Sequence, residues 1–240
     1  MTLPPVVLGV ILLTAFFVAL AVRTPLEGLL VLSAPEPSQP KRQFILDFIL
    51  CLAVGSAVML YNLRAYNFPV LSGLKVVLGC GIAGFFLSLD TALARERAAI
   101  HQANTTDRLL SPPKRLYPMT RKFSLVAFAA TLFVAAIIGL VISGDVVWLA
   151  KINQSEMSIA QAQQSVTYEV FFVMIVLLVW VVNLIVSYSR NLKLLFENET
   201  SVLERVSQGD LSKLVPVATN DEFGVIAGHT NTCLLYTSDA

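Results

Sequence analysis

The chain has 240 residues, of which 56% are hydrophobic and 14% are charged, and its formal net charge at pH 7 is +1. This composition is typical of integral membrane proteins, and the small net charge gives no electrostatic basis for binding nucleic acid. No C-x-x-C, H-E-x-x-H, P-loop or G-x-S-x-G motif occurs in the sequence, so we predict no catalytic residue, cofactor or metal site within this chain.

Five apolar stretches are long enough to cross a bilayer, which takes about 17–25 residues of helix. Each must be helical, because the backbone of a single spanning segment can satisfy its own hydrogen bonds in hydrocarbon only as a helix. We therefore predict an all-α integral membrane protein whose residues 1–188 form a transmembrane anchor. The five helices are expected at about residues 3–22, 44–61, 69–89, 123–142 and 170–188.

The basic residues predict the orientation of these helices. The loop 91–122 carries seven Lys and Arg residues, whereas the loop 143–169 carries one. The positive-inside rule then puts the loop 91–122 and the tail 189–240 in the cytoplasm of a bacterium, with the anchor in the inner membrane. Five spans would leave the N-terminus outside. Either a signal peptide or a sixth helix upstream of Met1 would resolve this, and we favour the sixth helix because a basic n-region is missing.

Several polar residues fall within the predicted spans. Asp47 is expected at the cytoplasmic interface rather than in an ion site, and Lys75 is expected to snorkel to the outer surface. Asn183 could donate a hydrogen bond to a partner helix, and Trp148 is expected as an interfacial anchor. The outer segment 143–169 is too short for a sensor domain of ordinary size. If the protein senses a stimulus directly, the membrane bundle is therefore the favoured sensor.

The segment 190–231 follows the last span directly and reads as two amphipathic helices joined by a connector. Its first helix has apolar residues at three- and four-residue spacing, a stripe so narrow that it requires partner helices. Gly209 is expected to end this helix in the left-handed conformation. Asn220 or Asp221 is expected to cap the second helix, and Glu222 in its first turn favours the positive end of the helix dipole.

This helix–connector–helix arrangement resembles a HAMP domain, on the basis of Gly209-Asp210-Leu211, Pro216 and Asp221-Glu222-Phe223-Gly224. One departure is Leu195, where many of these domains have proline. The resemblance implies a cytoplasmic relay over residues 189–232 that forms a parallel four-helix bundle from two chains, so a second copy and the lipid bilayer are the expected partners. The relay would be formed by Leu192, Leu195, Phe196, Val202, Leu203, Val206, Gly209, Asp210, Leu211, Val215, Pro216, Val217, Asp221, Glu222, Phe223, Gly224, Ile226 and Asn231.

The sequence of this segment is similar to the corresponding segment of bacterial class III adenylate/guanylate cyclases. In that family a multi-helix membrane anchor and a HAMP domain precede the catalytic domain. The resemblance implies the anchor and relay of a receptor-type cyclase, a phosphorus–oxygen lyase whose catalytic domain is absent from this chain. The alternatives are the same relay in a sensor histidine kinase or chemoreceptor, and a multi-helix transporter or channel subunit. The resemblance rests on Phe196, Val206, Val215-Pro216-Val217, Ile226-Ala227 and His229-Thr230-Asn231.

The last eight residues, 233–240, do not continue the pattern of the second relay helix. They resemble the in-frame translation of an adapter used in sequencing libraries. We therefore expect the natural sequence to continue beyond Thr232 in a different way.

Overall fold

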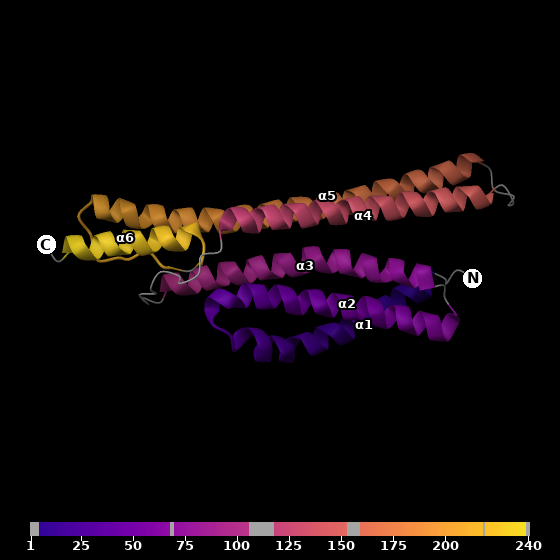
Figure 1. Cartoon of the computed structure of the whole chain (residues 1–240), viewed down its shortest axis with the longest axis horizontal. Helices are drawn as coiled ribbons and strands as arrows, with labels where there is room; N and C mark the ends of the chain where they lie inside the picture. The colour runs from indigo at the N-terminus through magenta and orange to yellow at the C-terminus, as the bar shows by residue number, and fades with distance from the viewer. Residues whose placement is uncertain (1–4, 68–69, 106–117, 153–158, 218, 239–240) are drawn as a thin grey trace.

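The computed structural model describes residues 5–67, 70–105, 118–152, 159–217 and 219–238, and within them all regular structure is helical (Figure 1). A π-helical turn, Gly28–Leu32, and a 3-10 turn, Glu36–Ser38, join the first two helices. The helices are α1, Pro5–Glu27; α2, Gln39–Tyr66; α3, Val70–Thr105; α4, Met119–Ile152; α5, Ile159–Ser207; and α6, Glu222–Ser238.

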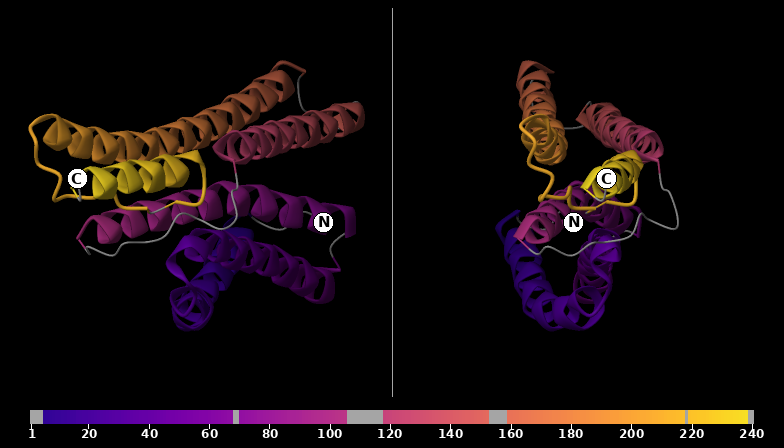
Figure 2. Two further views of the ribbon diagram at one scale, coloured as in Figure 1. Left: turned by 60° about the vertical axis from the view of Figure 1, so that its left-hand side comes forward. Right: turned by 90° about the vertical axis from the view of Figure 1, so that its left-hand side faces the viewer.

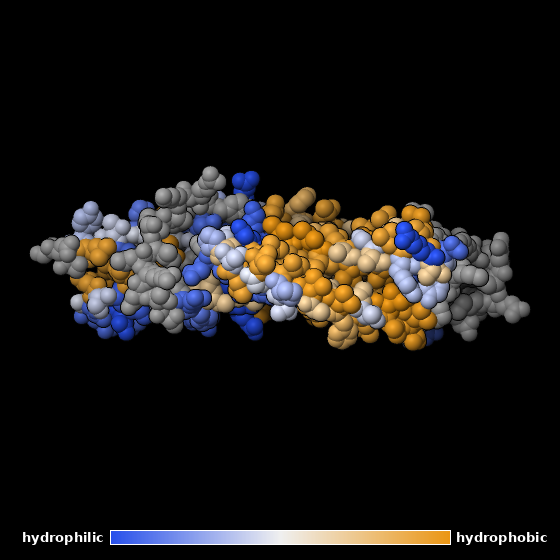
Figure 3. All heavy atoms as spheres, turned by 90° about the horizontal axis from the view of Figure 1, so that it is seen from below, coloured by the Kyte–Doolittle hydropathy of each residue, from blue (hydrophilic) through white to orange (hydrophobic). Residues whose placement is uncertain are grey.

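The prediction of an all-α membrane protein with five spans is confirmed for the described residues. Hydrophobic residues cover the middle of the long axis of the molecule, whereas hydrophilic residues gather at the end that carries α6 (Figure 3). By length and composition, five helical segments could cross a membrane: Gly9–Leu32, Gln39–Tyr66, Ser72–Gln102, Met119–Ile142 and Val166–Ser207.

The helices are longer than the apolar stretches from which they were predicted. The helix α5 has 49 residues and includes both the last predicted span and the first predicted relay helix without a break. Residues 143–152 and 159–169, expected in a connector, belong to α4 and α5. The side chain of Trp148 lies outside the described residues. Polar residues with high helix propensity allow a helix to continue past the apolar region into water.

The helices α2 and α3 form the most closely packed pair. Asn67, with φ of 49°, ends α2 in the left-handed conformation before the short link to α3. Small residues face each other along the pair: a Cβ atom on Gly84 would overlap that of Cys51, and one on Gly55 would lie 2.9 Å from that of Cys80. Close backbone approach over small residues is a common way for membrane helices to associate.

The helix α3 is central in the membrane part. Figures 1 and 2 show α1 and α2 on one side of it and α4 and α5 on the other. An apolar cluster joins α3 to these neighbours, in which Phe85 contacts Phe133 of α4 and Phe86 stacks on Trp180 of α5 at a centroid distance of 5.4 Å. The cluster lies in the membrane part of the bundle, so it fixes how α4 and α5 sit against α3.

The helix α6 lies beside the last part of α5 and runs in the same direction (Figures 1 and 2). The rings of Phe196 and Phe223 meet at a centroid distance of 5.0 Å, and further along Thr230 donates a hydrogen bond to Glu199. The connector 208–221 must therefore return along the pair before α6 begins. The helix α6 also continues into the last eight residues of the chain, through Ser238.

Candidate signal-relay site

A polar cluster joins α1, α2 and α3 near the end of the bundle that carries α6. The carboxylate of Asp47 accepts hydrogen bonds from Arg23 at 2.7 and 3.2 Å, from Gln43 at 2.9 Å and from Thr91 at 2.6 Å. Its side chain is only 5% exposed. The Asp47 carboxylate is thus buried between three helices and not free in water. Burial is possible because Arg23 supplies the opposite charge and all the bonds are donated to the anion.

A second polar cluster joins α3 to α5 close to this one. Arg97 donates to the backbone carbonyl and the hydroxyl of Ser187, at 3.1 and 3.0 Å, and to the side-chain oxygen of Asn191 at 2.9 Å. The amide of Asn191 donates to Glu96 at 2.9 Å, and the Ser187 hydroxyl donates to Asp90 at 2.6 Å. Because Ser187 and Asn191 are buried and one turn apart, this network fixes both the height and the rotation of α5 against α3.

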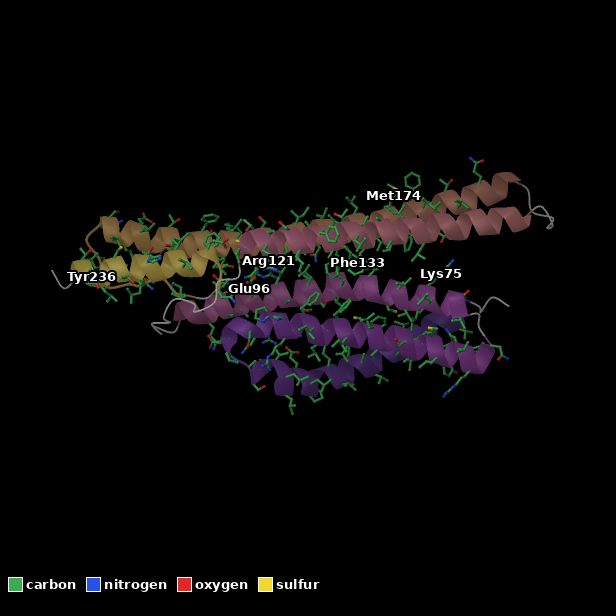
Figure 4. The ribbon with its side chains drawn as sticks, in the orientation of Figure 1. Lys75, Glu96, Arg121, Phe133, Met174 and Tyr236 are labelled. Atoms are coloured by element: carbon green, nitrogen blue, oxygen red, sulfur yellow. The ribbon has the colours of Figure 1, made fainter. Side chains whose placement is uncertain are left out.

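The start of α4 is joined directly to the start of α6. The ammonium group of Lys122 lies 3.0 Å from the Asp221 carboxylate, which also accepts a hydrogen bond from the Thr219 hydroxyl at 2.6 Å. Glu222 accepts a hydrogen bond of 2.7 Å from the backbone N–H of Met119, the first residue of α4. This N–H has no partner inside its own helix and carries the positive end of the helix dipole, so a carboxylate stabilises it. Figure 4 labels Glu96 and Arg121 in the region where α3, α4 and α6 meet.

The end of α5 follows the sequence prediction. Gly209 has φ of +86°, and the N–H of Asp210 donates to the carbonyl of Arg205, the hydrogen bond that closes a helix at a left-handed residue. The Asp210 carboxylate accepts hydrogen bonds from the hydroxyl and the backbone N–H of Ser212, and these bonds lower the pKa of its carboxyl group. The connector therefore leaves α5 in a defined direction.

An apolar cluster holds the connector between α5 and α6. Val202 of α5, Val215 and Val217 of the connector and Ala227 of α6 are all buried in it, and Leu234 near the end of α6 joins them. Five predicted relay residues are thus brought together: Val202, Val215 and Val217 are buried, and Val206 and Leu211 pack against them. The other members of the cluster are partly buried: Val206, Leu211 and Leu214.

Asn231 fastens the connector to α6. Its side-chain oxygen accepts a hydrogen bond of 2.7 Å from the backbone N–H of Val215, and its amide donates one of 2.8 Å to the carbonyl of the same residue. The amide side chain thereby pairs with the connector as a neighbouring strand would. Both backbone groups belong to a buried residue, so the side chain satisfies polar groups that water does not reach.

Replacement of Asn231 by alanine is expected to lower the free energy of unfolding of the α5–connector–α6 unit by about 2 kcal/mol, because it leaves a buried donor and acceptor without partners. Hydrogen exchange measured by mass spectrometry on peptides covering residues 211–217 would show faster exchange. The neighbouring exposed residue provides a control, His229→Ala, which should leave exchange unchanged. Equal protection in Asn231→Ala would show that the connector is held without this side chain.

Three apolar side chains of the predicted relay are exposed at this site. The exposed fractions of Phe196, Leu203 and Ile226 are 54%, 51% and 48%. Sequence reasoning also missed three contributors, Met119, Lys122 and Thr219. Lys122 was interpreted only as a determinant of topology, and no local pattern links it to Asp221, 99 residues later. Asp221 and Glu222 were expected to act on α6 itself, whereas their side chains bind the start of α4.

The comparisons with known proteins concern mainly the membrane part. A model of the MASE10 family, which describes membrane-associated sensory domains, matches residues 1–172. The chain belongs to the MASE10 family. The matched segment ends inside α5, before the candidate relay site. Membership of MASE10 and the helical membrane spans together identify a multi-pass protein of membrane signal transduction.

A relative of this MASE10 chain is a cyclic di-GMP phosphodiesterase of Vibrio cholerae serotype O1. The two are 29% identical over 196 residues, which is 81% of this chain and 39% of the relative. The chain thus spans less than half the length of the curated relative it matches. No solved structure matches the chain.

These findings overturn the resemblance to adenylate/guanylate cyclases. The family that matches is MASE10, and the Vibrio relative is a cyclic di-GMP phosphodiesterase and not an adenylate/guanylate cyclase. The motifs behind the cyclase interpretation all lie between Phe196 and Asn231, outside the matched family segment. They describe packing and turn residues of a helix–connector–helix, and such residues specify a relay geometry rather than the chemistry of the domain it controls.

Proposed function

We propose that this chain is the membrane sensor and relay of a protein that acts on cyclic di-GMP, and that it controls a phosphodiesterase activity located elsewhere in the whole protein. The family and the Vibrio relative support the signalling class. The single observation that carries the relay is the continuity of α5, which passes from the membrane span to the α6 contact without a break. A movement of α5 in the bilayer must therefore move its other end.

The end of α5, the connector and α6 act as a HAMP-like relay in this proposal. Two parallel helices with an extended connector packed between them support it, as do the left-handed Gly209 and the buried valine cluster. The exposed side chains of Phe196, Leu203 and Ile226 need cover in water, and a second copy of the chain would supply it as a parallel four-helix bundle. Asn183, exposed on the membrane part of α5, would then meet its counterpart in the partner helix.

A contact between α4 and α6 supports a second input to this relay. The helix α4 contacts α6 through Lys122–Asp221 and Met119–Glu222, although α4 and α6 are far apart in sequence. A shift of α4 relative to α5 would displace the first turn of α6, because this turn is bound to α4. The contacts between α5 and α6 would meanwhile keep the rest of α6 beside α5. The relay thus responds to the relative position of two membrane helices, which is a two-state element that a membrane signal can bias. The basic loop 91–122 supports a cytoplasmic location for this end of the molecule.

Charge reversal at the α4–α6 contact tests this function in membranes that carry the whole protein. We expect these membranes to hydrolyse cyclic di-GMP. Lys122→Glu and Asp221→Lys should each change the rate in the same direction by about fivefold, and the double reversal should return it to within about twofold, as expected for a coupling carried by one ion pair. The measurement is the rate of cyclic di-GMP loss, with the exposed ion pair Lys193–Glu197 reversed as a control.

Two results would contradict the proposal in different ways. Membranes without any cyclic di-GMP hydrolysis would remove the assigned output. Normal hydrolysis that neither single reversal alters would leave the output in place and remove the α4–α6 contact from the relay.

A further inference from the structure

A cavity of 610 Å³ lies between α3, α4 and α5 in the membrane part of the bundle. Its walls are mostly apolar, with Ile137 from α4 and Val173 and Trp180 from α5 among them. This volume falls in the range of about 300–1,000 Å³ that is usual for small-molecule sites. Figure 4 labels Lys75, a lining residue, near the end of α3 that lies away from α6.

Two opposite charges lie at one end of the cavity. Lys75 and Glu169 both line it, and they are three residues after the start of their candidate spans, Ser72–Gln102 and Val166–Ser207. Both are therefore near the membrane surface away from α6. Among the described residues, no ion pair joins Lys75 and Glu169 to each other or to another charged group. A second cavity, of 700 Å³ between α1 and α2, has no charged lining residue.

We propose that the cavity binds an amphiphile with an apolar tail and a zwitterionic head group, drawn from the leaflet away from α6. The apolar walls fit the tail. An anionic phosphate would face the Lys75 ammonium, and a cationic amine would face the Glu169 carboxylate. A ligand with a head group of one sign would satisfy one of these residues and be repelled by the other. Both side chains are exposed, so a head group at the membrane surface can reach them, and their opposite charges favour a zwitterion.

Such a ligand would set the distance of α4 and α5 from α3. The same three helices meet the relay at their other ends, through the Arg97–Asn191 network and the Lys122–Asp221 pair. That binding of this ligand acts as a signal therefore rests on the proposed relay function. Binding itself does not depend on that function, and it can be measured without any cyclic di-GMP.

Fluorescence of Trp180 reports on the cavity directly. The chain has two tryptophans, so Trp148→Phe leaves Trp180 as the only one. The protein is placed in nanodiscs of unbrominated lipid and titrated with lysophosphatidylethanolamine that carries a brominated tail. Occupation of the cavity brings bromine next to Trp180, so we expect quenching that saturates at a small fraction of probe in the bilayer.

A glycine substitution provides a variant that fills the cavity. Gly79 lines it, and a Cβ atom there would meet no atom within 4 Å, so Gly79→Leu adds a side chain to the cavity without a backbone clash. This variant should abolish the saturable quenching. Gly139→Leu in α4 makes the same change at another open position that does not line the cavity, and it should bind the probe as the parent does.

Head-group specificity is tested with two further brominated probes, lysophosphatidylglycerol and a free fatty acid. Half-saturation should require at least about tenfold more of either, a difference of one decade in affinity. Glu169→Gln, which removes the carboxylate that repels an anionic head group and leaves Lys75 in place, should lose most of this preference while it retains the tail contact.

Quenching that rises linearly with probe and is equal in Gly79→Leu would overturn the proposal, because it would reflect bulk lipid beside Trp180. Equal affinity for all three probes would overturn the zwitterionic assignment, and absence of quenching would show that another helix or a second copy fills the cavity. Saturable, specific binding without any effect on cyclic di-GMP hydrolysis would leave the site intact and overturn its role as the signal that the relay carries.

Discussion

Replacement of Asp47 by leucine is expected to lower the free energy of unfolding by about 3–5 kcal/mol, which is the cost of removing one partner of a buried ion pair. The change leaves the Arg23 guanidinium without its principal anion and removes the acceptor used by Gln43 and Thr91. The helix α1 should therefore detach from α2 and α3. Heating in detergent with a thiol-reactive dye measures this, because Cys51 and Cys80 are buried and react only on opening. The exposed thiol is removed beforehand by Cys233→Ser.

A double variant separates the ion pair from simple packing. Removal of both charges, in Arg23→Met with Asp47→Leu, leaves no unpaired charge, and replacement of a buried pair by apolar groups is often neutral. We expect the double variant to recover at least about half of the stability lost in Asp47→Leu. If Asp47→Leu alone had the unfolding temperature of the parent, the carboxylate would lie in water at the interface, as the sequence had suggested.

The number and type of helices could be predicted from the sequence because each apolar stretch meets a strict requirement. A span must be helical and about 20 residues long. The ends of the helices could not be predicted in this way. At the end of α3, the segment 92–105 is polar and rich in alanine, so it has helix propensity and no reason to stop at the membrane surface. The same holds for α5 beyond Arg190.

The polar contacts were beyond sequence reasoning for a different reason. Asp47 and Thr91 are 44 residues apart, and Arg97 and Asn191 are 94 apart. Whether such residues meet depends on the rotation of each helix about its own axis, which an apolar stretch surrounded by lipid does not specify. A charged residue inside a predicted span indicates that it has a function or a polar partner. Only the packing of the helices shows which residue that partner is.

The output chemistry was misjudged because the membrane anchor carries none of it. The residues used to choose a cyclase were apolar or turn-forming positions of the relay segment, such as Val206 and Pro216. These residues report how helices and a connector pack, and the same packing can precede unrelated domains. The family came from the segment 1–172, whose local motifs showed only that it crosses the membrane.

The glycines of the relay segment differ in how well the sequence explains them. The position of Gly209 after an amphipathic helix was sufficient to predict its left-handed backbone, which the structure has. Gly224 lies within α6, where glycine is unfavourable by about 0.5–1 kcal/mol relative to alanine. Glycine is required there because the backbone of Thr219 approaches α6 closely, and a Cβ atom at residue 224 would overlap its carbonyl oxygen. No local sequence pattern reveals this approach.

Gly224→Ala is accordingly expected to destabilise the relay by about 3 kcal/mol, at the upper end of overpacking effects, because the obstacle is backbone and not the tip of a flexible side chain. The methyl group must push the connector away from α6. Thr219 would then lose its hydrogen bond to Asp221, and Asp221 would shift from Lys122. Hydrogen exchange over residues 219–228 should become faster, and in the whole protein the effect on cyclic di-GMP turnover should have the same sign as that of Lys122→Glu.

The control makes the same substitution where space is open. Gly139→Ala adds a methyl group to α4 with no atom within 4 Å, so helix propensity alone should leave its stability unchanged or raise it by up to about 1 kcal/mol. The two variants are therefore predicted to differ in sign. If Gly224→Ala were as stable as Gly139→Ala, the connector would not be in contact with α6 at Thr219, and the path from α4 through Lys122 and Asp221 would lose its structural basis. A destabilised Gly224→Ala with unchanged turnover would keep the contact and assign the signal to α5 alone.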